Sequence, residues 1–378
     1  MGQRKAVTKK MATRYRRVDK AEKARMLDEL CELTGWHRDH ARKALRQALK
    51  PKLVKPVPPR REPVYGPEVI DALGFCWAVM GAPTGKRMAP FLGELVPRLR
   101  RQDELKISDE TAAALVSMSA ATIDRRLVED RAKLGIRGRS HTKPGSLLKD
   151  AIPIRTWAQW DDAVPGFVEI DLVGHEGGNA VGDHCYTLTV TDIATGWTEE
   201  RTVKNKAQKW VFAALMEITE AFPFPIIGID SDNGSEFINW HLLKWCEEHK
   251  ITFTRSRAGN SNDGAHVEQK NWAIVRTVAG YHRYDTEAEQ ELLNKIWLLQ
   301  SSMTNFFNPS QKLVSKVRDG AKVTKKYDTA TTPFQRADRH RAISKARKKA
   351  MAKTYKDLNP AAIQRQIQAL TFELLTLT

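Results

Sequence analysis

Cysteine is scarce in this 378-residue sequence, and its four copies lie far apart, at positions 31, 76, 185 and 246. Without a Cys-x-x-Cys pair, neither a zinc site nor a disulfide framework is expected, which suits a reducing intracellular setting such as the cytoplasm. No apolar run approaches the roughly 20 residues needed to span a bilayer. Nor does an apolar signal core follow the basic N-terminus. These absences predict a soluble globular protein without a membrane partner.

Motifs of two common enzyme classes are also missing. No Gly-x-Ser-x-Gly elbow is present, which argues against acyl-transfer chemistry. The stretch Gly81-Ala-Pro-Thr-Gly-Lys-Arg87 is superficially similar to a phosphate-binding loop. Its glycines are one residue too close, and Arg87 stands where a hydroxyl is needed, so this interpretation is rejected.

Charged residues are abundant, the net charge is +17, and the charges are unevenly distributed along the chain. Residues 1–62 hold 19 Lys/Arg against 7 Asp/Glu, and residues 301–378 hold 16 against 5. Residues 151–300 reverse the balance, with 13 against 22. Clustered Lys and Arg are typical of nucleic-acid binding through phosphate neutralisation, with solvated helix faces as the alternative. Basic ends around an acidic middle favour double-stranded DNA as the partner.

Residues 20–50 have the pattern of two short helices. Met26, Leu27, Leu30 and Leu33 are expected on one helical face, and a Gly-containing turn at 34–37 precedes a basic second helix. This arrangement predicts a DNA-binding helix-turn-helix unit, although any small helical hairpin has a similar pattern. The residues expected to contact DNA are Arg38, Arg42, Lys43 and Arg46.

A second helical region follows a linker with five prolines between positions 51 and 63. Residues 108–118 and 122–134 have helical spacing, which indicates a second helix-turn-helix or an ordinary helical connector. Ser108 is expected to cap the first helix. In the helix-turn-helix interpretation, Thr122, Arg125 and Arg126 face DNA.

From residue 166 the pattern changes to an α/β domain. Strands are expected at 166–173, 184–191, 196–203, 226–230 and 251–254, and helices at 206–222, 235–249, 266–281 and 285–307. This order predicts a mixed sheet flanked by helices. The predicted domains are 1–50, 65–135, 166–284 and a helical basic region at 285–378, with linkers at 51–64 and 136–165.

Three acidic residues stand where a cation-dependent phosphoryl-transfer site needs them. Asp171 lies in an apolar strand, Asp232 follows the apolar run 226–229, and Glu268 comes 36 positions later on a predicted helix. Carboxylates at strand ends and on a nearby helix can converge on Mg²⁺, which prefers oxygen ligands. Asp230 is an alternative to Asp232, and Glu169 is a neighbour of Asp171 expected at the sheet rim.

These motifs together resemble the catalytic core of the DDE transposases and retroviral integrases. They are Val168-Glu-Ile-Asp-Leu-Val-Gly-His175, Asp230-Ser-Asp-Asn-Gly-Ser-Glu-Phe237 and Asp263-Gly-Ala-His-Val-Glu268. The 35 residues between Asp232 and Glu268, and Asn271 one turn later, match the family's pattern. Over about a third of the chain, the resemblance implies an RNase H-like fold. It also implies two Mg²⁺ (or Mn²⁺) ions per active site, held by Asp171, Asp232 and Glu268.

The sequence departs from the retroviral pattern in two places. No His/Cys zinc module is supported at the N-terminus, and Trp272 stands where retroviral proteins have a Lys. Lys270 and Arg276 are expected to contact the DNA backbone instead. The helix-turn-helix units look more like those of bacterial insertion-sequence transposases. The tryptophans at 197, 210, 240, 245 and 272 are expected in the core rather than as platforms for bases.

The predicted function is a DNA transposase. It would cut element ends and join them to target DNA as a homo-oligomer, since two ends must be joined. A nuclease that stops at hydrolysis is one alternative. A sequence-specific DNA-binding regulator, or a domesticated transposase without catalysis, is the other.

Overall fold

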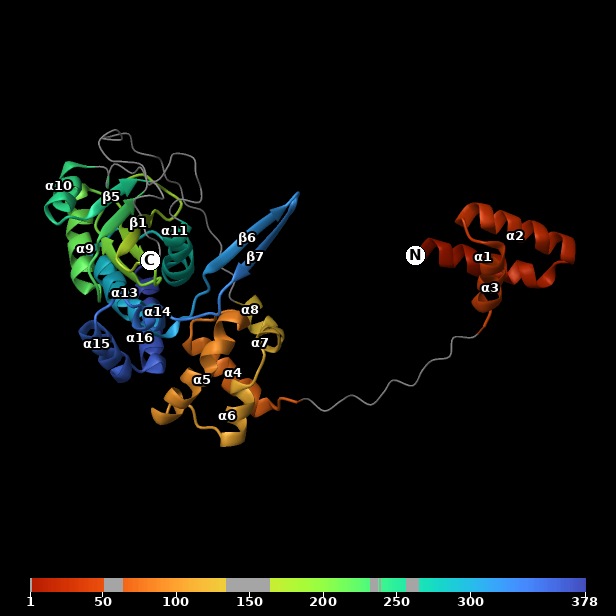
Figure 1. The fold of residues 1–378 in the computed structure, drawn as a ribbon, viewed down its shortest axis with the longest axis horizontal. Helices are drawn as coiled ribbons and strands as arrows, with labels where there is room; N and C mark the ends of the chain where they lie inside the picture. The colour runs from red at the N-terminus through yellow and green to blue at the C-terminus, as the bar shows by residue number, and fades with distance from the viewer. Residues whose placement is uncertain (1, 51–63, 134–163, 232–236, 238, 256–264) are drawn as a thin grey trace. The chain divides into compact units, whose positions relative to one another are not determined.

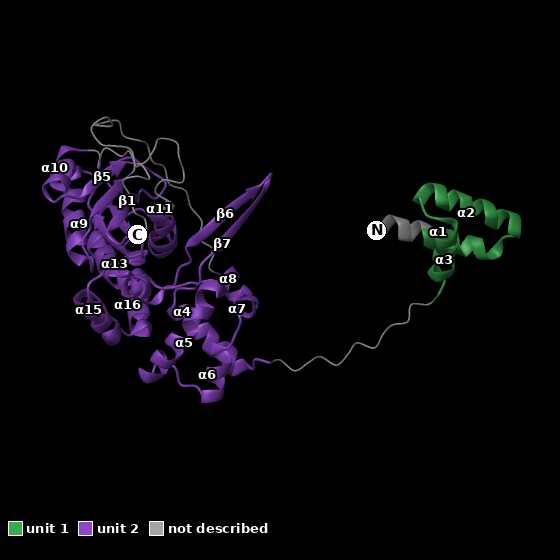
Figure 2. Cartoon of the chain, in the orientation of Figure 1, with its two compact units in different colours: residues 1–63 green, residues 64–378 purple. Residues whose placement is uncertain are grey.

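The computed structural model describes residues 2–50, 64–133, 164–231, 237, 239–255 and 265–378 (Figure 1). The chain divides into two compact units, residues 1–63 and residues 64–378 (Figure 2). The predicted linkers fall almost wholly outside the described residues. Within the described ranges, no helix is both long enough and apolar enough to cross a bilayer.

The first unit is a bundle of three helices, α1 (Gly2–Arg17), α2 (Lys20–Thr34) and α3 (Arg38–Ala48). Asp19 caps α2 by accepting a 2.8 Å hydrogen bond from the backbone N–H of Glu22, and Gly35 ends it at φ +68°. Five apolar residues form the core: Ala12, Leu27, Leu30, Ala41 and Leu45. Two predicted helices are therefore confirmed. Helix α1 was not foreseen, and Leu33 is 73% exposed rather than buried.

The second unit begins with five helices, α4 (Pro67–Val79), α5 (Gly85–Arg101), α6 (Asp109–Val116), α7 (Ala120–Arg126) and α8 (Val128–Ala132). Ser108 caps α6 as predicted, because its Oγ accepts a 3.1 Å hydrogen bond from the N–H of Thr111. The single helix expected at 122–134 is divided at Leu127, whose φ of −97° and ψ of 12° leave helical geometry while its side chain is buried. Packing of this leucine outweighs local helical preference.

A five-stranded sheet forms the centre of this unit. Its strands are β1 (Phe167–Gly174), β2 (Tyr186–Asp192), β3 (Thr198–Val203), β4 (Gly228–Ser231) and β5 (Thr252–Arg255). They are ordered β3-β2-β1-β4-β5. Strands β1, β2 and β3 pair antiparallel, whereas β4 runs parallel to β1 and β5. This is the mixed RNase H-like sheet that the sequence predicted, and β1 is its middle strand.

Helices cover the sheet and continue beyond it. They are α9 (Gln208–Ala221), α10 (Trp240–Glu248), α11 (Ala265–Lys270), α12 (Thr277–Ala279) and α13 (Glu287–Phe307). Between α11 and α12, the residues Asn271–Arg276 form a turn of π-helix, η1. A π turn inside an α-helix often marks a functional site, because it changes the direction of the side chains around it.

The C-terminal region contains a hairpin as well as the helices expected there. Strands β6 (Leu313–Asp319) and β7 (Lys322–Tyr327) pair antiparallel, and α14 (Pro333–Arg339), α15 (Lys345–Asp357) and α16 (Pro360–Leu377) follow. Helix α5 is tied to this region by Arg98, whose guanidinium lies 3.9 Å from the centre of the Tyr355 ring. Arg98 also donates hydrogen bonds to the carbonyls of Tyr355 and Leu358, at 2.9 and 3.2 Å.

Candidate active site and DNA-binding surfaces

Asp171 lies on the middle strand of the sheet, with β2 on one side and β4 on the other. Its side chain is half-buried. One carboxylate oxygen, Oδ2, accepts a 2.6 Å hydrogen bond from Nδ2 of Asn271, at the start of η1. The other, Oδ1, accepts a 2.8 Å bond from the backbone N–H of Leu172. The strand and the helix that carry two of the predicted acids are therefore joined at Asp171.

Glu169 connects the same two elements at a second point. Its carboxylate Oε2 accepts hydrogen bonds from the backbone N–H groups of His266 and Val267, at 2.9 and 3.1 Å. These N–H groups belong to the first turn of α11, where the helix has no acceptor of its own and attracts negative charge. Glu169 is 1% exposed, so its expected place at the sheet rim was wrong. The sequence shows that Glu169 lies two residues before Asp171 on a buried strand. It gives no signal that the Glu169 carboxylate binds the first turn of α11.

Glu268 is exposed on α11, three residues before Asn271. Residues three apart on a helix are neighbours on one face. Since Asn271 reaches Asp171, the helical run that carries Glu268 lies against this strand, while the Glu268 carboxylate's part in the site stays a prediction. Asp232 lies outside the described residues. Strand β4 ends just before it, at Ser231, which pairs with Ile170, the residue preceding Asp171.

Asp230, the alternative second acid, is used inside the sheet. It is 1% exposed, and its Oδ1 accepts a 2.6 Å hydrogen bond from the Thr254 hydroxyl on β5. Asp192 ends β2 and closes the turn to β3, where its carboxylate accepts bonds from the N–H groups of Gly166 and Thr195, each 2.7 Å. These contacts give both carboxylates a role within the sheet.

At Asp171 the structure brings a carboxylate and a buried amide oxygen, that of Asn271, side by side. Within the described part of the chain, no group of three or more His, Cys, Asp or Glu side chains could hold a metal ion. The expected third carboxylate, Asp232, is not in that part. In the same part, Oδ1 of Asn271 is buried without a hydrogen-bond partner, beside the carboxylate that its Nδ2 binds. A buried amide oxygen next to a carboxylate fits a hard cation such as Mg²⁺.

Lys270 and Arg276 follow Glu268 along the same helical run. Lys270 is half-buried, and burial together with the nearby Arg87 lowers its pKa to about 8, against the opposing effect of Glu200. Arg276 is 7% exposed and donates to the carbonyls of Gly174 and Gly280, at 2.8 and 3.3 Å. Both side chains are thus partly or fully buried in the structure, and their contacts with DNA stay predictions.

The four cations predicted on the first unit differ in what they contact. Arg38 pairs with Asp28 of α2 and Arg42 with Asp39, the latter at 2.9 Å. Lys43 and Arg46 are exposed on α3. This helix therefore carries two paired arginines and two exposed cations, and its role in binding DNA stays a prediction.

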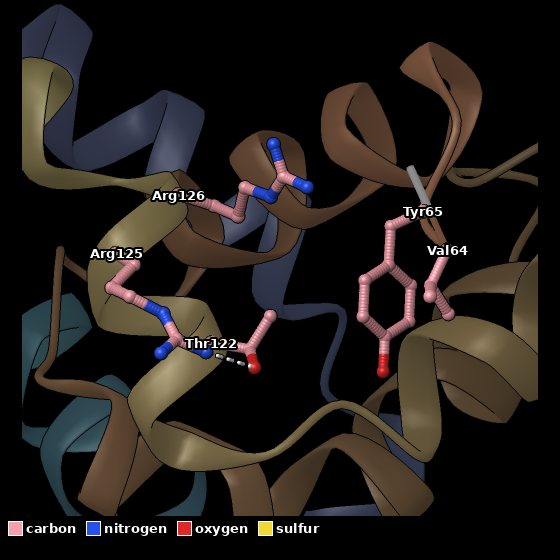
Figure 3. Close-up of a pocket in the computed structure, with 5 residues that line it drawn as sticks. All are labelled: Val64, Tyr65, Thr122, Arg125 and Arg126. Atoms are coloured by element: carbon pink, nitrogen blue, oxygen red, sulfur yellow. Dashed lines mark hydrogen bonds between the residues drawn. The ribbon is translucent and has the colours of Figure 1, made fainter. Parts of the chain in front are cut away.

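A basic hollow lies beside the second candidate helix-turn-helix (Figure 3). Its lining consists of Val64, Tyr65, Thr122, Arg125 and Arg126. Figure 3 shows the Arg125 guanidinium turned back to Thr122, whose hydroxyl accepts a 3.1 Å hydrogen bond from it. Both arginines are exposed on α7. This surface has the charge to bind a phosphate backbone.

The tryptophans divide between interior and surface. Trp197 is 4% exposed, as expected for a core residue. Trp210, Trp240 and Trp272 are 40%, 64% and 63% exposed, so the core prediction was wrong for them. Trp272 follows Asn271 directly in η1, and its indole is exposed.

Comparison with known proteins identifies the central part of the chain. A family model described as "Integrase core domain" matches residues 161–261. The uncharacterized protein y4rM of Sinorhizobium fredii (strain NBRC 101917 / NGR234) is 39% identical over 339 residues. The match covers 89% of this chain and 95% of that protein.

Among the solved structures similar to this chain are catalytic cores of viral integrases. The HTLV-2 integrase catalytic core domain in complex with magnesium is 13% identical, with a TM-score of 0.32, covering 46% of this chain and 98% of that one. The catalytic core domain of BIV integrase is 15% identical, with a TM-score of 0.31, and the match covers 45% of this chain and 91% of that one. The chain belongs to the same family as y4rM, and over residues 161–261 it carries an integrase core domain like that of DDE transposases and integrases.

Proposed function

We propose that this protein is a DNA transposase that cuts the ends of an element and joins them to target DNA. The observation that carries the proposal is the joining of β1, inside the integrase core domain, to the α11–η1 helix that follows that domain, through Asn271 and Asp171 at 2.6 Å. This contact brings the helix of Glu268 to the strand of Asp171.

Asp171, Asp232 and Glu268 are the residues that would hold two Mg²⁺ (or Mn²⁺) ions. When bound, such ions stabilise the attacking and leaving oxygens of an in-line displacement at phosphorus. Asn271 orients the Asp171 carboxylate, and Glu169 holds the first turn of α11 so that Glu268 keeps its place. The acidic middle of the chain supplies the carboxylates, while the basic helical units at the N-terminus retain the DNA.

Two displacements at one site account for the reaction. In the first, the oxygen of water bonds to phosphorus and the bond to the 3′ oxygen breaks, which frees a 3′-hydroxyl on the element. In the second, that hydroxyl attacks a target phosphodiester and displaces the target's own 3′ oxygen. Both steps develop the same negative charge at phosphorus, so one preorganised centre serves both. Joining two ends to one target favours a homo-oligomer.

Substitution of the acids tests this proposal. We expect Glu268→Gln and Asp171→Asn to bind element-end DNA like the unchanged protein while Mg²⁺-dependent cleavage falls at least about 10²-fold. Glu291→Gln removes an exposed carboxylate from α13 and is the matched control. Equal loss of binding and cleavage would indicate a folding role and contradict the proposal.

The same preparation separates the transposase from its alternatives. A purified protein that joins pre-cut ends to a plasmid is a transposase, whereas cleavage without joining indicates a nuclease. A protein that binds DNA but neither cuts nor joins it in Mg²⁺ or Mn²⁺ would favour the regulator.

A further inference from the structure

The β6–β7 hairpin stands out from the body of its unit as a two-stranded ribbon (Figure 1). Every residue of both strands is exposed. Gly320, at the first position of the two-residue turn, has φ +56°, which suits the tight turns that join twisted strands. A lone hairpin is at best marginally stable in water, so a ribbon of this kind usually has a partner.

On one face of the ribbon, every charged residue is a cation. Cross-strand partners share a face, and the pairs Lys316–Lys325 and Arg318–Val323 lie together on one of them. We name Lys316, Arg318 and Lys325 the cationic face. In the described part of the chain, none of the three belongs to an ion pair.

The direct pairing of Lys316 with Lys325 is unfavourable in the isolated protein. Like charges directly opposite one another destabilise an antiparallel pair. The opposite face carries Lys322 and Lys326 against a single acid, Asp319. A polyanion bound along the ribbon would remove this repulsion, and a neutral or cationic partner would not.

The base of the ribbon is held firmly. Asp328, after β7, accepts a 2.6 Å hydrogen bond from the backbone N–H of Lys312, before β6. It also pairs with Arg336 of α14 at 3.2 Å. The Lys312 ammonium donates to the carbonyl of Ala194, in the turn between β2 and β3, at 2.8 Å. The hairpin is thus attached both to the C-terminal helices and to the sheet, which fixes its direction.

Apolar side chains on the ribbon raise one other candidate, a second copy of this chain. They are Leu313, Val314, Val317, Val323 and Tyr327. Five Lys and Arg residues against one Asp between positions 313 and 327 oppose this, because two such ribbons would repel each other. The charge is complementary to nucleic acid.

We propose that the β6–β7 ribbon is a DNA-binding element that lies in a groove of the duplex and contacts phosphates through its cationic face. Seven residues of β6 extend about 23 Å, and the major groove, about 12 Å wide, accepts a two-stranded ribbon. The inference rests on DNA being the substrate of the core, but it concerns binding alone. It adds a third contact region to the two helical ones predicted from the sequence.

The test compares two full-length variants that lose the same charge. The first is Lys316→Gln with Arg318→Gln and Lys325→Gln. The control is Lys345→Gln with Lys349→Gln and Lys353→Gln, three exposed lysines of α15. Binding to labelled duplex DNA is followed by fluorescence anisotropy from about 50 to 200 mM salt, in EDTA so that no cleavage occurs. Thermal unfolding and sedimentation are measured on each protein.

For the hairpin variant we expect a salt dependence of log K shallower by about 3, and affinity about tenfold lower or more. Its unfolding temperature should be unchanged or slightly higher. The control should keep the original slope. An unchanged slope in the hairpin variant overturns the inference, and so does a variant that loses self-association while keeping the slope.

A second measurement uses the unchanged protein. We expect duplex DNA to slow chemical acetylation of Lys316 and Lys325 but not of Lys345. Equal rates with and without DNA would also overturn the inference. Because neither assay needs catalysis, failure of strand transfer would refute the transposase proposal and leave this one standing.

Discussion

Replacing Glu169 by Gln tests how the candidate site is held together. The Glu169 carboxylate accepts two backbone N–H groups from the first turn of α11, at 2.9 and 3.1 Å, and is 1% exposed. Gln keeps the size and one acceptor oxygen but removes the negative charge. The substitution therefore weakens the attachment of the helix that carries Glu268 without changing any predicted metal ligand.

The cost follows from these two hydrogen bonds. A bond to a charged group contributes about 1.5–3 kcal/mol, and a neutral one about 0.5–1.5 kcal/mol. Losing the charge from two bonds therefore lowers the free energy of unfolding by about 2 kcal/mol. For a unit of this size, that corresponds to a fall in Tm of roughly 2 to 4 °C. The effect on cleavage should be larger, because misplacing a catalytic group by about 1 Å can cost about 10²-fold in rate.

Hydrogen exchange shows where the change acts. We expect the amides of His266 and Val267 to exchange faster in Glu169→Gln, and Mg²⁺-dependent cleavage to fall with DNA binding retained. Asp192→Asn is the control, because Asp192 is also buried and its carboxylate also accepts hydrogen bonds from two backbone N–H groups. Those groups belong to Gly166 and Thr195, which are not part of α11. It should lower stability without altering exchange in α11.

Two results would refute this reasoning. Unchanged exchange at His266 and Val267 in Glu169→Gln would show that the carboxylate does not hold α11. Equal losses of cleavage in Glu169→Gln and Asp192→Asn would show that the effect is general destabilisation.

Three further predictions concern other parts of the chain. Burial, reinforced by Glu199, raises the pKa of Glu200 to about 8, so this group makes the free energy of unfolding fall as pH rises from about 4.5 to 8. Glu200→Gln should flatten that fall in denaturant titrations, and an unchanged profile would contradict the assignment. Arg98→Ala should lower the free energy of unfolding by about 2–4 kcal/mol, because the contacts between α5 and α15 are lost. Arg98→Lys should restore little of this stability, since Lys lacks the planar guanidinium that stacks on Tyr355. Full recovery of stability in the Lys variant would argue against that stacking. Arg42→Ala with Arg46→Ala should weaken DNA binding with a shallower salt dependence, and an unchanged dependence would remove α3 from the interface.

The sequence by itself determined the order of strands and helices in the core and the candidate acids. Asp171 on β1 and Glu268 on α11 lie on the elements predicted for them, because strand and helix periodicity and Gly-containing turns are local signals. The resemblance to integrases came from short motifs of the same local kind. Local patterns did not predict α1, and they treated the 313–327 hairpin as part of a helical region.

Only the tertiary structure decided which side chains meet. The hydrogen bond from Asn271 to Asp171 joins residues 100 positions apart, and Glu169 reaches the N–H groups of α11 across 97 and 98 positions. Periodicity assigns a residue to a face of its own element but does not say which element packs there. That choice depends on chain topology, and it made Glu169 a buried support for α11 and left the β6–β7 ribbon exposed.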